Sequence, residues 1–189
     1  MLIYITGVAG SGKSTVYEEL LKRGLEAYDG ENHKEMYARY EDGMYNRYGK
    51  LTGKKNTKPR AAYLGYQTRK WLDNHECRIS KKSVEQMVKE TEGRTAFLVC
   101  GVAANIVEVR SLFAQVFCLT VDEEALRCRL TSRKSPAYGQ AAEELRHILG
   151  LRVAAENSLR QLGTVIVDAT QPVNVIVNEI LARLEVKRS

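Results

Sequence analysis

The feature that most constrains the fold is the N-terminal octapeptide Gly7-Val8-Ala9-Gly10-Ser11-Gly12-Lys13-Ser14. It matches G-x-x-x-x-G-K-[ST] at every fixed position, and Thr15 follows it. An apolar, β-branched run at residues 2–6 precedes the motif, and a helical pattern at residues 14–23 follows it. Glycines let successive backbone N–H groups curve around an anion, and a helix N-terminus adds further N–H groups. We therefore predict a phosphate-binding loop between a strand and a helix.

The residue types in this loop indicate the ligand. Lys13 supplies a cation for the β- and γ-phosphates of a nucleotide, and the Ser14 hydroxyl is a ligand for Mg²⁺. We expect residues 7–15 to bind ATP together with Mg²⁺, and Lys13 to act in catalysis as well.

Strand and helix patterns alternate along the chain and predict an α/β fold. We expect strands at residues 2–6, 25–28, 96–100, 116–121 and 164–167. We expect helices at residues 14–23, 34–40, 61–72, 83–91, 107–113, 123–133, 142–149, 152–162 and 173–184. Asp122 is the expected N-cap of the sixth of these helices, and Gly150 the expected break between the seventh and eighth.

Such alternation builds βαβ units, so we predict a P-loop NTPase with a parallel sheet of about five strands and helices on both faces. The 189 residues fit one domain, 1–189. Residues 31–92 break the pattern and include a loop at 43–59 rich in Gly, Lys and Asn. We interpret 31–92 as an acceptor-binding insertion. A second loop is expected at residues 135–139.

Composition indicates where such a protein works. The four cysteines, Cys77, Cys100, Cys118 and Cys128, form no metal-ligand or CxxC spacing. Cys100 and Cys118 lie in apolar runs and are expected to be small buried hydrophobes. No apolar run approaches the ~20 residues of a membrane helix, and the apolar start is too short for a signal peptide. We expect a soluble, cytoplasmic protein with no membrane partner.

The net charge of +6 is unevenly distributed. Residues 44–82 hold eleven basic and two acidic residues, a net charge of +9, so the rest of the chain carries −3. Aromatic residues, Tyr37, Tyr40, Tyr45, Tyr48, Tyr63, Tyr66 and Trp71, lie in and beside this segment. The pattern favours an anionic or nucleoside-like acceptor that stacks on rings. A solvated basic face, with the rings packed in the insertion's own core, is the alternative.

Two absences bear on the class of P-loop protein. GTPases and motor ATPases usually end a strand with an Asp that holds Mg²⁺, whereas the strand at 96–100 ends in Cys100-Gly101. No N-K-x-D guanine-recognition motif occurs in the chain. Both features favour a small-molecule kinase, a class that can hold Mg²⁺ through the P-loop hydroxyl and water.

At this point the chain resembles the nucleoside monophosphate kinase-like P-loop kinases, which include adenylate, shikimate and gluconate kinases. Four stretches carry the resemblance: the GVAGSGKST loop, Tyr28-Asp29-Gly30-Glu31-Asn32-His33, Arg129-Leu130-Thr131-Ser132-Arg133, and Val167-Asp168-Ala169-Thr170-Gln171-Pro172. The resemblance implies that Arg129 and Arg133 begin a lid over residues 133–149 and act on the phosphates. It also implies that Thr170, Gln171 and Pro172 lie against the adenine.

Asp29 ends a predicted strand at the carboxyl edge of the sheet, where ligands of open α/β sheets bind. We expect it to accept the acceptor's proton or to hold Mg²⁺. The alternative is a simple Asp-Gly turn. Glu31 is a second carboxylate candidate, and His33 is more simply a surface residue.

The sequence thus predicts an ATP-dependent kinase of a small acceptor, a nucleotide or nucleoside in the first instance. A sugar, an antibiotic or a nucleic-acid 5′ end is the alternative acceptor. A P-loop ATPase or binding module that phosphorylates nothing is the alternative outside the kinases.

Overall fold

A computed structural model describes residues 1–32, 36–41, 75–133 and 138–185 of the chain. Its centre is a parallel sheet of five strands in the order β2-β5-β1-β6-β7. The strands are β1 (Leu2–Thr6), β2 (Glu26–Asp29), β5 (Ala96–Val99), β6 (Gln115–Thr120) and β7 (Val165–Asp168). The predicted fold class, strand number and strand positions are confirmed to within two residues.

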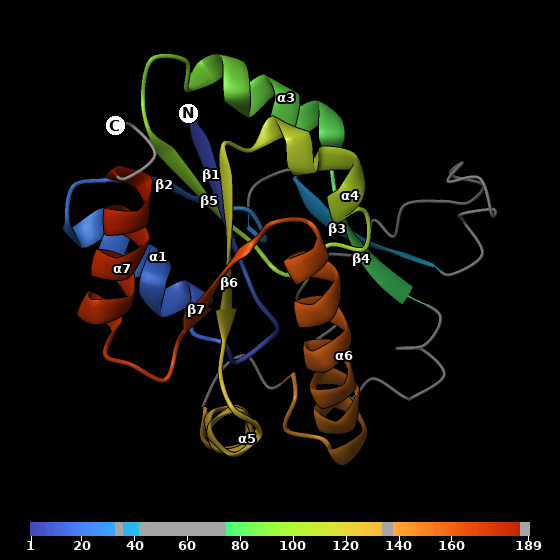
Figure 1. Cartoon of the computed structure of the whole chain (residues 1–189). Coiled ribbons are helices and arrows are strands. Elements are labelled where there is room, and N and C mark those ends of the chain that lie inside the picture. Colours follow the sequence, from blue (N-terminus) through green and yellow to red (C-terminus); the bar gives the residue numbers. More distant parts are fainter. Residues whose placement is uncertain (33–35, 42–74, 134–137, 186–189) are drawn as a thin grey trace.

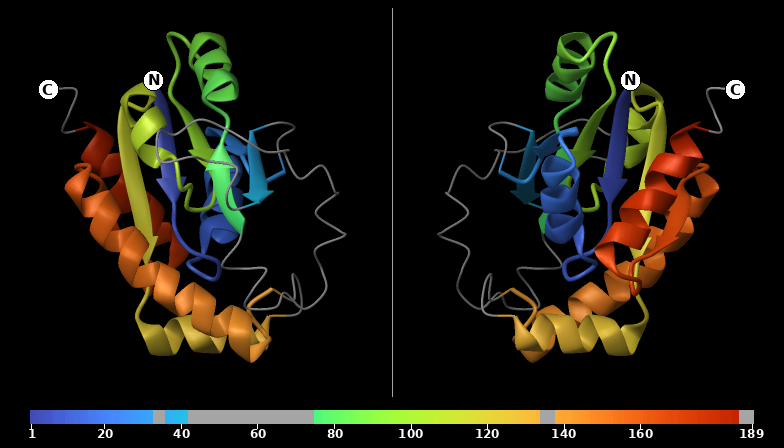
Figure 2. Two further views of the ribbon diagram at one scale, coloured as in Figure 1. Left: turned by 90° about the vertical axis from the view of Figure 1, so that its right-hand side faces the viewer. Right: turned by 90° about the vertical axis from the view of Figure 1, so that its left-hand side faces the viewer.

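Helices cover both faces of the sheet (Figure 1). They are α1 (Lys13–Lys22), α3 (Lys81–Glu90), α4 (Ile106–Val109), α5 (Glu123–Ser132), α6 (Ala142–Gln161) and α7 (Val173–Glu185), with a 3₁₀ turn η2 (Arg110–Leu112) after α4. α1 and α7 lie together on one face, while α3 and α4 lie on the other, as both views in Figure 2 show. α5 begins at its predicted N-cap, because the Asp122 carboxylate accepts a hydrogen bond from Ala125 N at 2.7 Å.

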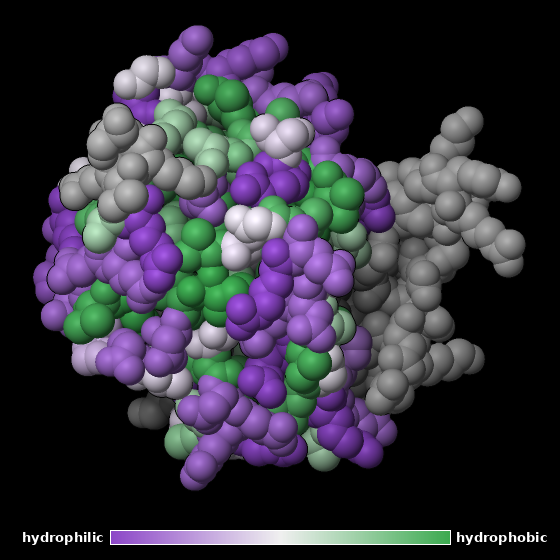
Figure 3. Space-filling view, in the orientation of Figure 1, coloured by the Kyte–Doolittle hydropathy of each residue, from purple (hydrophilic) through white to green (hydrophobic). Residues whose placement is uncertain are grey.

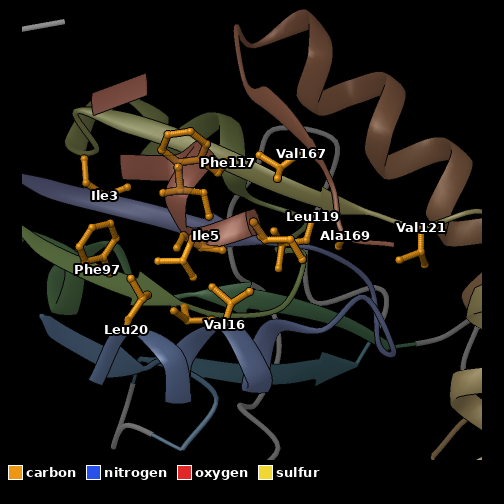
Figure 4. Packing of buried hydrophobic residues seen from close by; sticks show 14 of the residues in the cluster. Ile3, Ile5, Val16, Leu20, Phe97, Phe117, Leu119, Val121, Val167 and Ala169 are labelled. Atoms are coloured by element: carbon orange, nitrogen blue, oxygen red, sulfur yellow. The ribbon is translucent and has the colours of Figure 1, made fainter. Parts of the chain in front are cut away.

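The sheet separates two hydrophobic clusters. Alternate residues of β1 point to opposite faces, so Ile3 and Ile5 join one cluster, and Leu2 and Tyr4 join the other. Figure 4 shows the first cluster, in which Val16 and Leu20 of α1 pack against Ile5 and Phe97. The buried strands read as continuous apolar runs because helices cover both of their sides.

β7 is an edge strand of the sheet. Val165 and Ile166 in it are half-buried, and hydrophobic residues interrupt the polar surface between α6 and α7 (Figure 3).

No helix in the described part of the chain is long and apolar enough to cross a membrane.

One predicted helix is wrong. A helix was predicted at 34–40, but strand β3 (Tyr37–Glu41) begins within this range and pairs antiparallel with β4 (His75–Ile79). Two tyrosines in five residues suit a strand, but the partner lies more than thirty residues further along the chain. Local periodicity does not reveal such a pairing. The helix predicted at 61–72 and the loop predicted at 43–59 lie outside the described residues.

A second prediction is wrong at Gly150. The helices expected on either side of it are one continuous helix, α6. A glycine inside a helix costs only about 1 kcal/mol relative to alanine, and the long amphipathic segment around it outweighs this cost. Gly150 is exposed, and a Cβ built on it would meet nothing within 4 Å.

The four cysteines are free. Cys100 and Cys118 are buried, as predicted, and burial raises the pKa of both thiols, that of Cys118 to about 12. A buried thiol of this kind is inert and packs as an apolar group.

Candidate active site

The predicted phosphate loop connects β1 to α1, as its strand–loop–helix context requires. Gly10 and Gly12 adopt left-handed backbone conformations, with φ of 85° and 97°. Gly12 is the N-cap of α1, and no side chain caps that helix end. The first N–H groups of α1 therefore face the loop, where an anion would satisfy them.

Lys13 is folded back over this loop. Its Nζ donates hydrogen bonds to the carbonyl oxygens of Gly7 and Val8 at 2.8 and 3.0 Å. The Glu31 Oε1 atom lies 3.8 Å from the same nitrogen. Two neutral carbonyls and a longer ion pair hold the ammonium group loosely, so phosphate oxygens can replace them.

The turn after β2 places the carboxylates. Asp29 Oδ1 accepts hydrogen bonds from the backbone N–H groups of Glu31 and Asn32 at 3.0 and 3.2 Å. Its Oδ2 accepts one from Asn32 Nδ2 at 2.6 Å. Asp29 thus forms the turn that the sequence allowed as an alternative, and it directs the next carboxylate, Glu31, toward Lys13.

Gly30 lets this turn lie flat on the core. A Cβ built on Gly30 would stand 2.9 Å from Cys100 Cβ and 3.0 Å from Leu98 Cδ1. The Gly30 N–H donates to the carbonyl oxygen of Val99 at 2.8 Å. The turn is therefore fixed against the carboxyl end of β5.

Lys13, Ser14, Asp29 and Glu31 line one depression at the carboxyl edge of the sheet. The predicted metal residues, Ser14 and Asp29, are both in it. No group of three or more His, Cys, Asp or Glu side chains that could hold a metal ion occurs in the described residues. A hydroxyl, one or two carboxylates and water oxygens are the ligands that suit Mg²⁺.

Arg129 reaches the phosphate loop from α5. A Cβ built on Gly12 would lie 3.6 Å from Arg129 Nη1, and Arg129 Nη2 donates to the carbonyl oxygen of Ala169 at 2.8 Å. The guanidinium group therefore lies beside the phosphate loop and is hydrogen-bonded to the segment after β7. The resemblance implies that these three segments lie at the nucleotide, and in the structure they lie side by side.

The segment after β7 is a turn organised by Asp168. Its Oδ1 accepts hydrogen bonds from the N–H and the hydroxyl of Thr170 at 2.9 and 2.7 Å. The Thr170 hydroxyl is the main cause that lowers the pKa of Asp168, and the charge of Arg129 contributes. Thr170 and Gln171 are exposed, and the Pro172 carbonyl accepts from Val175 N and Ile176 N in the first turn of α7.

Arg133 ends α5 as its C-cap, one turn beyond Arg129. Its carbonyl oxygen accepts a hydrogen bond from Gln140 Nε2 at 2.5 Å, and its Nε and Nη2 atoms are buried. Residues 134–137 of the predicted lid, and His33, lie outside the described residues. Residues 142–149 of the predicted lid are the first turns of α6.

Arg152 of α6 is a residue that the sequence analysis missed. Its Nη1 donates to the carbonyl oxygen of Val121 at 3.1 Å, and its buried Nε has no hydrogen-bond partner within the described part of the chain. Val121 directly follows β6, so Arg152 lies at the carboxyl edge of the sheet. No local signal could have found it, because an arginine on a helix is usually solvated.

Comparison with known proteins shows the family. The family model described as AAA domain matches residues 3–150. The chain belongs to this AAA domain family. The matched residues of the AAA domain run from β1 to the middle of α6, so they include the phosphate loop, the Asp29 turn and Arg129. No curated protein matches the chain significantly.

Solved kinase structures share the fold of this AAA domain. A shikimate kinase from Bacteroides thetaiotaomicron is 16% identical, with a TM-score of 0.59 and 98% of both chains covered. A sugar kinase from Janibacter sp. is 16% identical, with a TM-score of 0.54 and coverage of 97% of this chain and 94% of that chain. A deoxyadenosine kinase from M. mycoides with bound dATP is 17% identical, with a TM-score of 0.54 and coverage of 98% and 99%. The resemblance to nucleoside monophosphate kinase-like P-loop kinases is confirmed in the fold.

Proposed function

We propose that this protein is an ATP-dependent phosphotransferase that acts on a small acceptor. One observation carries the proposal: the Lys13 ammonium and the Glu31 carboxylate face each other at 3.8 Å, in one depression with Ser14 and Asp29. The ammonium suits the transferred phosphoryl group, and the carboxylates suit Mg²⁺ or the attacking hydroxyl.

The residues present fit ATP and Mg²⁺. Gly12 has a φ of 97°, a backbone conformation that favours glycine, and the N–H groups at the start of α1 lack a side-chain cap. Residues 7–15 would hold the phosphates, and Ser14 with Asp29 or Glu31 would hold the metal, directly or through water. Bound Mg²⁺ would supply charge neutralisation between the β- and γ-phosphates. Thr170, Gln171 and Pro172 would lie along the adenine.

Asp29 and Glu31 would have different roles in the reaction. Asp29 accepts three hydrogen bonds within its turn, so its main role would be to orient the turn. Its carboxylate still lines the depression. Glu31 is closer to Lys13, and we assign it the proton of the acceptor's hydroxyl. As that proton passes to Glu31, the acceptor oxygen bonds to the phosphorus and the bond to the leaving diphosphate oxygen breaks.

Three arginines would neutralise the charge that develops in this transfer. Arg129 lies beside Gly12 of the phosphate loop, and the buried Nε of Arg152 has no hydrogen-bond partner within the described residues. Arg133 stands one helical turn from Arg129 and would complete the set from the base of the lid. Guanidinium groups fit phosphate oxygens because they offer a planar fork of donors.

We propose a small anionic or nucleoside-like molecule as the acceptor. Two observations support a small acceptor: residues 44–82 are basic and aromatic, and the similar structures include sugar, shikimate and deoxyadenosine kinases. A nucleic-acid 5′ end is less favoured. The four free cysteines suit a reducing cytoplasm.

Radiolabelled [γ-³²P]ATP with Mg²⁺ tests the proposal. The protein is incubated with nucleosides, nucleoside monophosphates, shikimate, gluconate and short oligonucleotides, and the products are separated. We expect ADP and one labelled acceptor. ADP with free phosphate at the same rate whatever is added would overturn the proposal and make the protein an ATPase.

Variants of the carboxylates separate their roles. Glu31→Gln should lower kcat about 10²-fold or more, because it removes a general base. Glu18→Gln changes an exposed carboxylate on α1 and is the matched control. Equal activity in Glu31→Gln and Glu18→Gln would remove Glu31 from the reaction.

A further inference from the structure

The turn between β5 and α4, residues 100–105, is held from one side by Tyr4. The Tyr4 hydroxyl donates to the carbonyl oxygen of Gly101 at 2.6 Å. Tyr4 is fully buried, and its ring stacks on Phe113 with centroids 4.9 Å apart and planes at 19°. Burial raises the pKa of Tyr4, so the phenol remains a hydrogen-bond donor. This bond fixes Gly101 to β1, the strand that leads into the phosphate loop.

The other end of the same turn holds β4. Asn105 Oδ1 accepts from Ile79 N at 3.0 Å, and Asn105 Nδ2 donates to the Ile79 carbonyl oxygen at 2.9 Å. Ala104 N donates to the carbonyl oxygen of Cys77 at 2.8 Å. The amide of Asn105, which is 6% exposed, thus takes the place that a neighbouring strand would have beside β4.

Two more contacts hold β4 in place. Arg78 Nη2 and Glu108 Oε1 of α4 form an ion pair at 2.6 Å, in which the Arg78 side chain is only 10% exposed. Directly after β4, Ser80 N donates to the carbonyl oxygen of Met36 at 2.8 Å. The two-stranded sheet is therefore joined to the central sheet through the start of α4 and the 100–105 turn.

The position of this turn gives the contacts a functional meaning. In the order β2-β5-β1, the end of β5 lies between the Asp29 turn and the phosphate loop. The 100–105 turn starts at Cys100, against which Gly30 of the Asp29 turn lies, and it bonds β4 through Ala104 and Asn105. A displaced β4 would therefore disturb the 100–105 turn beside Asp29 and Glu31, the carboxylates on the acceptor's side of the site, and leave the phosphate loop in place.

We propose that Asn105 is a positioning residue for the acceptor side of the site, and that Tyr4 sets the turn from which it acts. The inference rests on the proposed function, because it assumes an acceptor at this edge of the sheet. It assigns a role to a buried polar side chain that touches neither the phosphate loop nor the two carboxylates by any described hydrogen bond.

Amide hydrogen exchange of the whole protein tests the contact without any acceptor. In Asn105→Ala, exchange at Ile79 should quicken about tenfold or more, because two buried hydrogen bonds to this residue are lost. The affinity for Mg·ATP should stay within about twofold, because residues 7–15 are untouched. Thr91→Val is the matched control: it removes the buried bond from Thr91 Oγ1 to the Met87 carbonyl on the same face of the sheet, away from β4.

Asn105→Asp adds a readout that a general loss of packing does not produce. The ionised carboxylate can accept from Ile79 N but opposes the Ile79 carbonyl oxygen, whereas the protonated acid can donate to it. Exchange at Ile79, relative to the wild type at the same pH, should therefore slow as the pH falls through the pKa of the new carboxyl, which burial raises. In Asn105→Ala, exchange at Ile79 relative to the wild type should not slow as the pH falls.

The reaction gives the final measurement. With whichever compound of the panel the wild type phosphorylates, Asn105→Ala should raise KM for that compound and leave KM for ATP unchanged. The inference would be overturned if the amide of Ile79 exchanged at the same rate in Asn105→Ala as in the wild type. It would also be overturned if the variant lost as much affinity for Mg·ATP as for the acceptor. Failure of the wild type to bind Mg·ATP would instead overturn the proposed function, so the two failures are distinguishable.

Discussion

Gly10→Ala probes how the phosphate loop is supported. Gly10 occupies one of the variable positions of the motif, so the sequence pattern alone tolerates alanine there. In the structure its φ is +85°, and an added Cβ would lie 2.8 Å from Leu126 Cδ1 and 3.0 Å from Leu130 Cδ2. Both leucines belong to α5 and are fully buried, so they have little room to withdraw.

Two costs add in this variant. The left-handed conformation costs alanine about 1–2 kcal/mol, and an extra methyl group in a well-packed core costs about 1–3 kcal/mol. The free energy of unfolding should therefore fall by roughly 2–5 kcal/mol, a large part of the about 5–15 kcal/mol typical of a domain. The loop must also shift, so Mg·ATP should bind at least about tenfold more weakly.

Urea unfolding and ATP titration measure the two effects. Gly24→Ala is the matched control, because Gly24 has φ of +74° and an added Cβ meets nothing within 4 Å. It should show the conformational cost alone and bind Mg·ATP normally. In a double-mutant cycle, Gly10→Ala should cost less in the Leu126→Ala background, since the closer of the two clashes is gone and only the contact with Leu130 remains. Equal costs for Gly10→Ala and Gly24→Ala, with no coupling to Leu126, would refute the packing of this loop on α5.

Three further predictions concern charges. Lys13→Ala should abolish turnover and leave the fold intact by circular dichroism, because the Lys13 ammonium lies over the phosphate loop; a folded variant with full activity would contradict the site. Arg129→Ala should lower kcat at least about 10²-fold, whereas Arg127→Ala, whose side chain pairs with Glu123 on the exposed surface, should not; steady-state kinetics compares them. The pKa of Asp168 is lowered, so the stability that its hydrogen bonds give is present above the ordinary value of 3.8 and is lost as the pH falls through the lowered value. Thr170→Val removes the hydroxyl that is the main cause, so the pKa of Asp168 should rise in an NMR titration. An unchanged pKa would contradict the turn.

Local pattern was sufficient for the layered core and the phosphate loop. The apolar run at 2–6, the glycines and the basic–hydroxyl pair Lys13-Ser14 specify a strand, a loop and a helix through neighbouring residues alone. The N-cap at Asp122 was equally local, because its hydrogen bond joins residues three positions apart in the sequence. Such features depend on periodicity and on contacts within one turn, which a single sequence displays.

Other features of the site depend on contacts between distant segments. The sequence left Asp29 and Glu31 as alternatives, and only the folded turn shows that Asp29 bonds the backbone while Glu31 faces Lys13. β3 was mistaken for a helix because its partner, β4, is remote in the chain. Arg152 carried no local signal, since an arginine on a helix is usually solvated.

The sequence by itself determined that a phosphate-binding loop follows the first strand of a parallel α/β sheet, because those residues form their structure with their nearest neighbours. The tertiary structure decided which side chains surround that loop. Arg129 lies beside Gly12 only after the strands have taken the order β2-β5-β1-β6-β7. The hydrogen bonds of Arg152 to Val121 and of Asn105 to Ile79 likewise join segments that are remote in the chain. The physical reason is that a parallel sheet gathers the carboxyl ends of strands far apart in the chain at one edge, and no local pattern records that order.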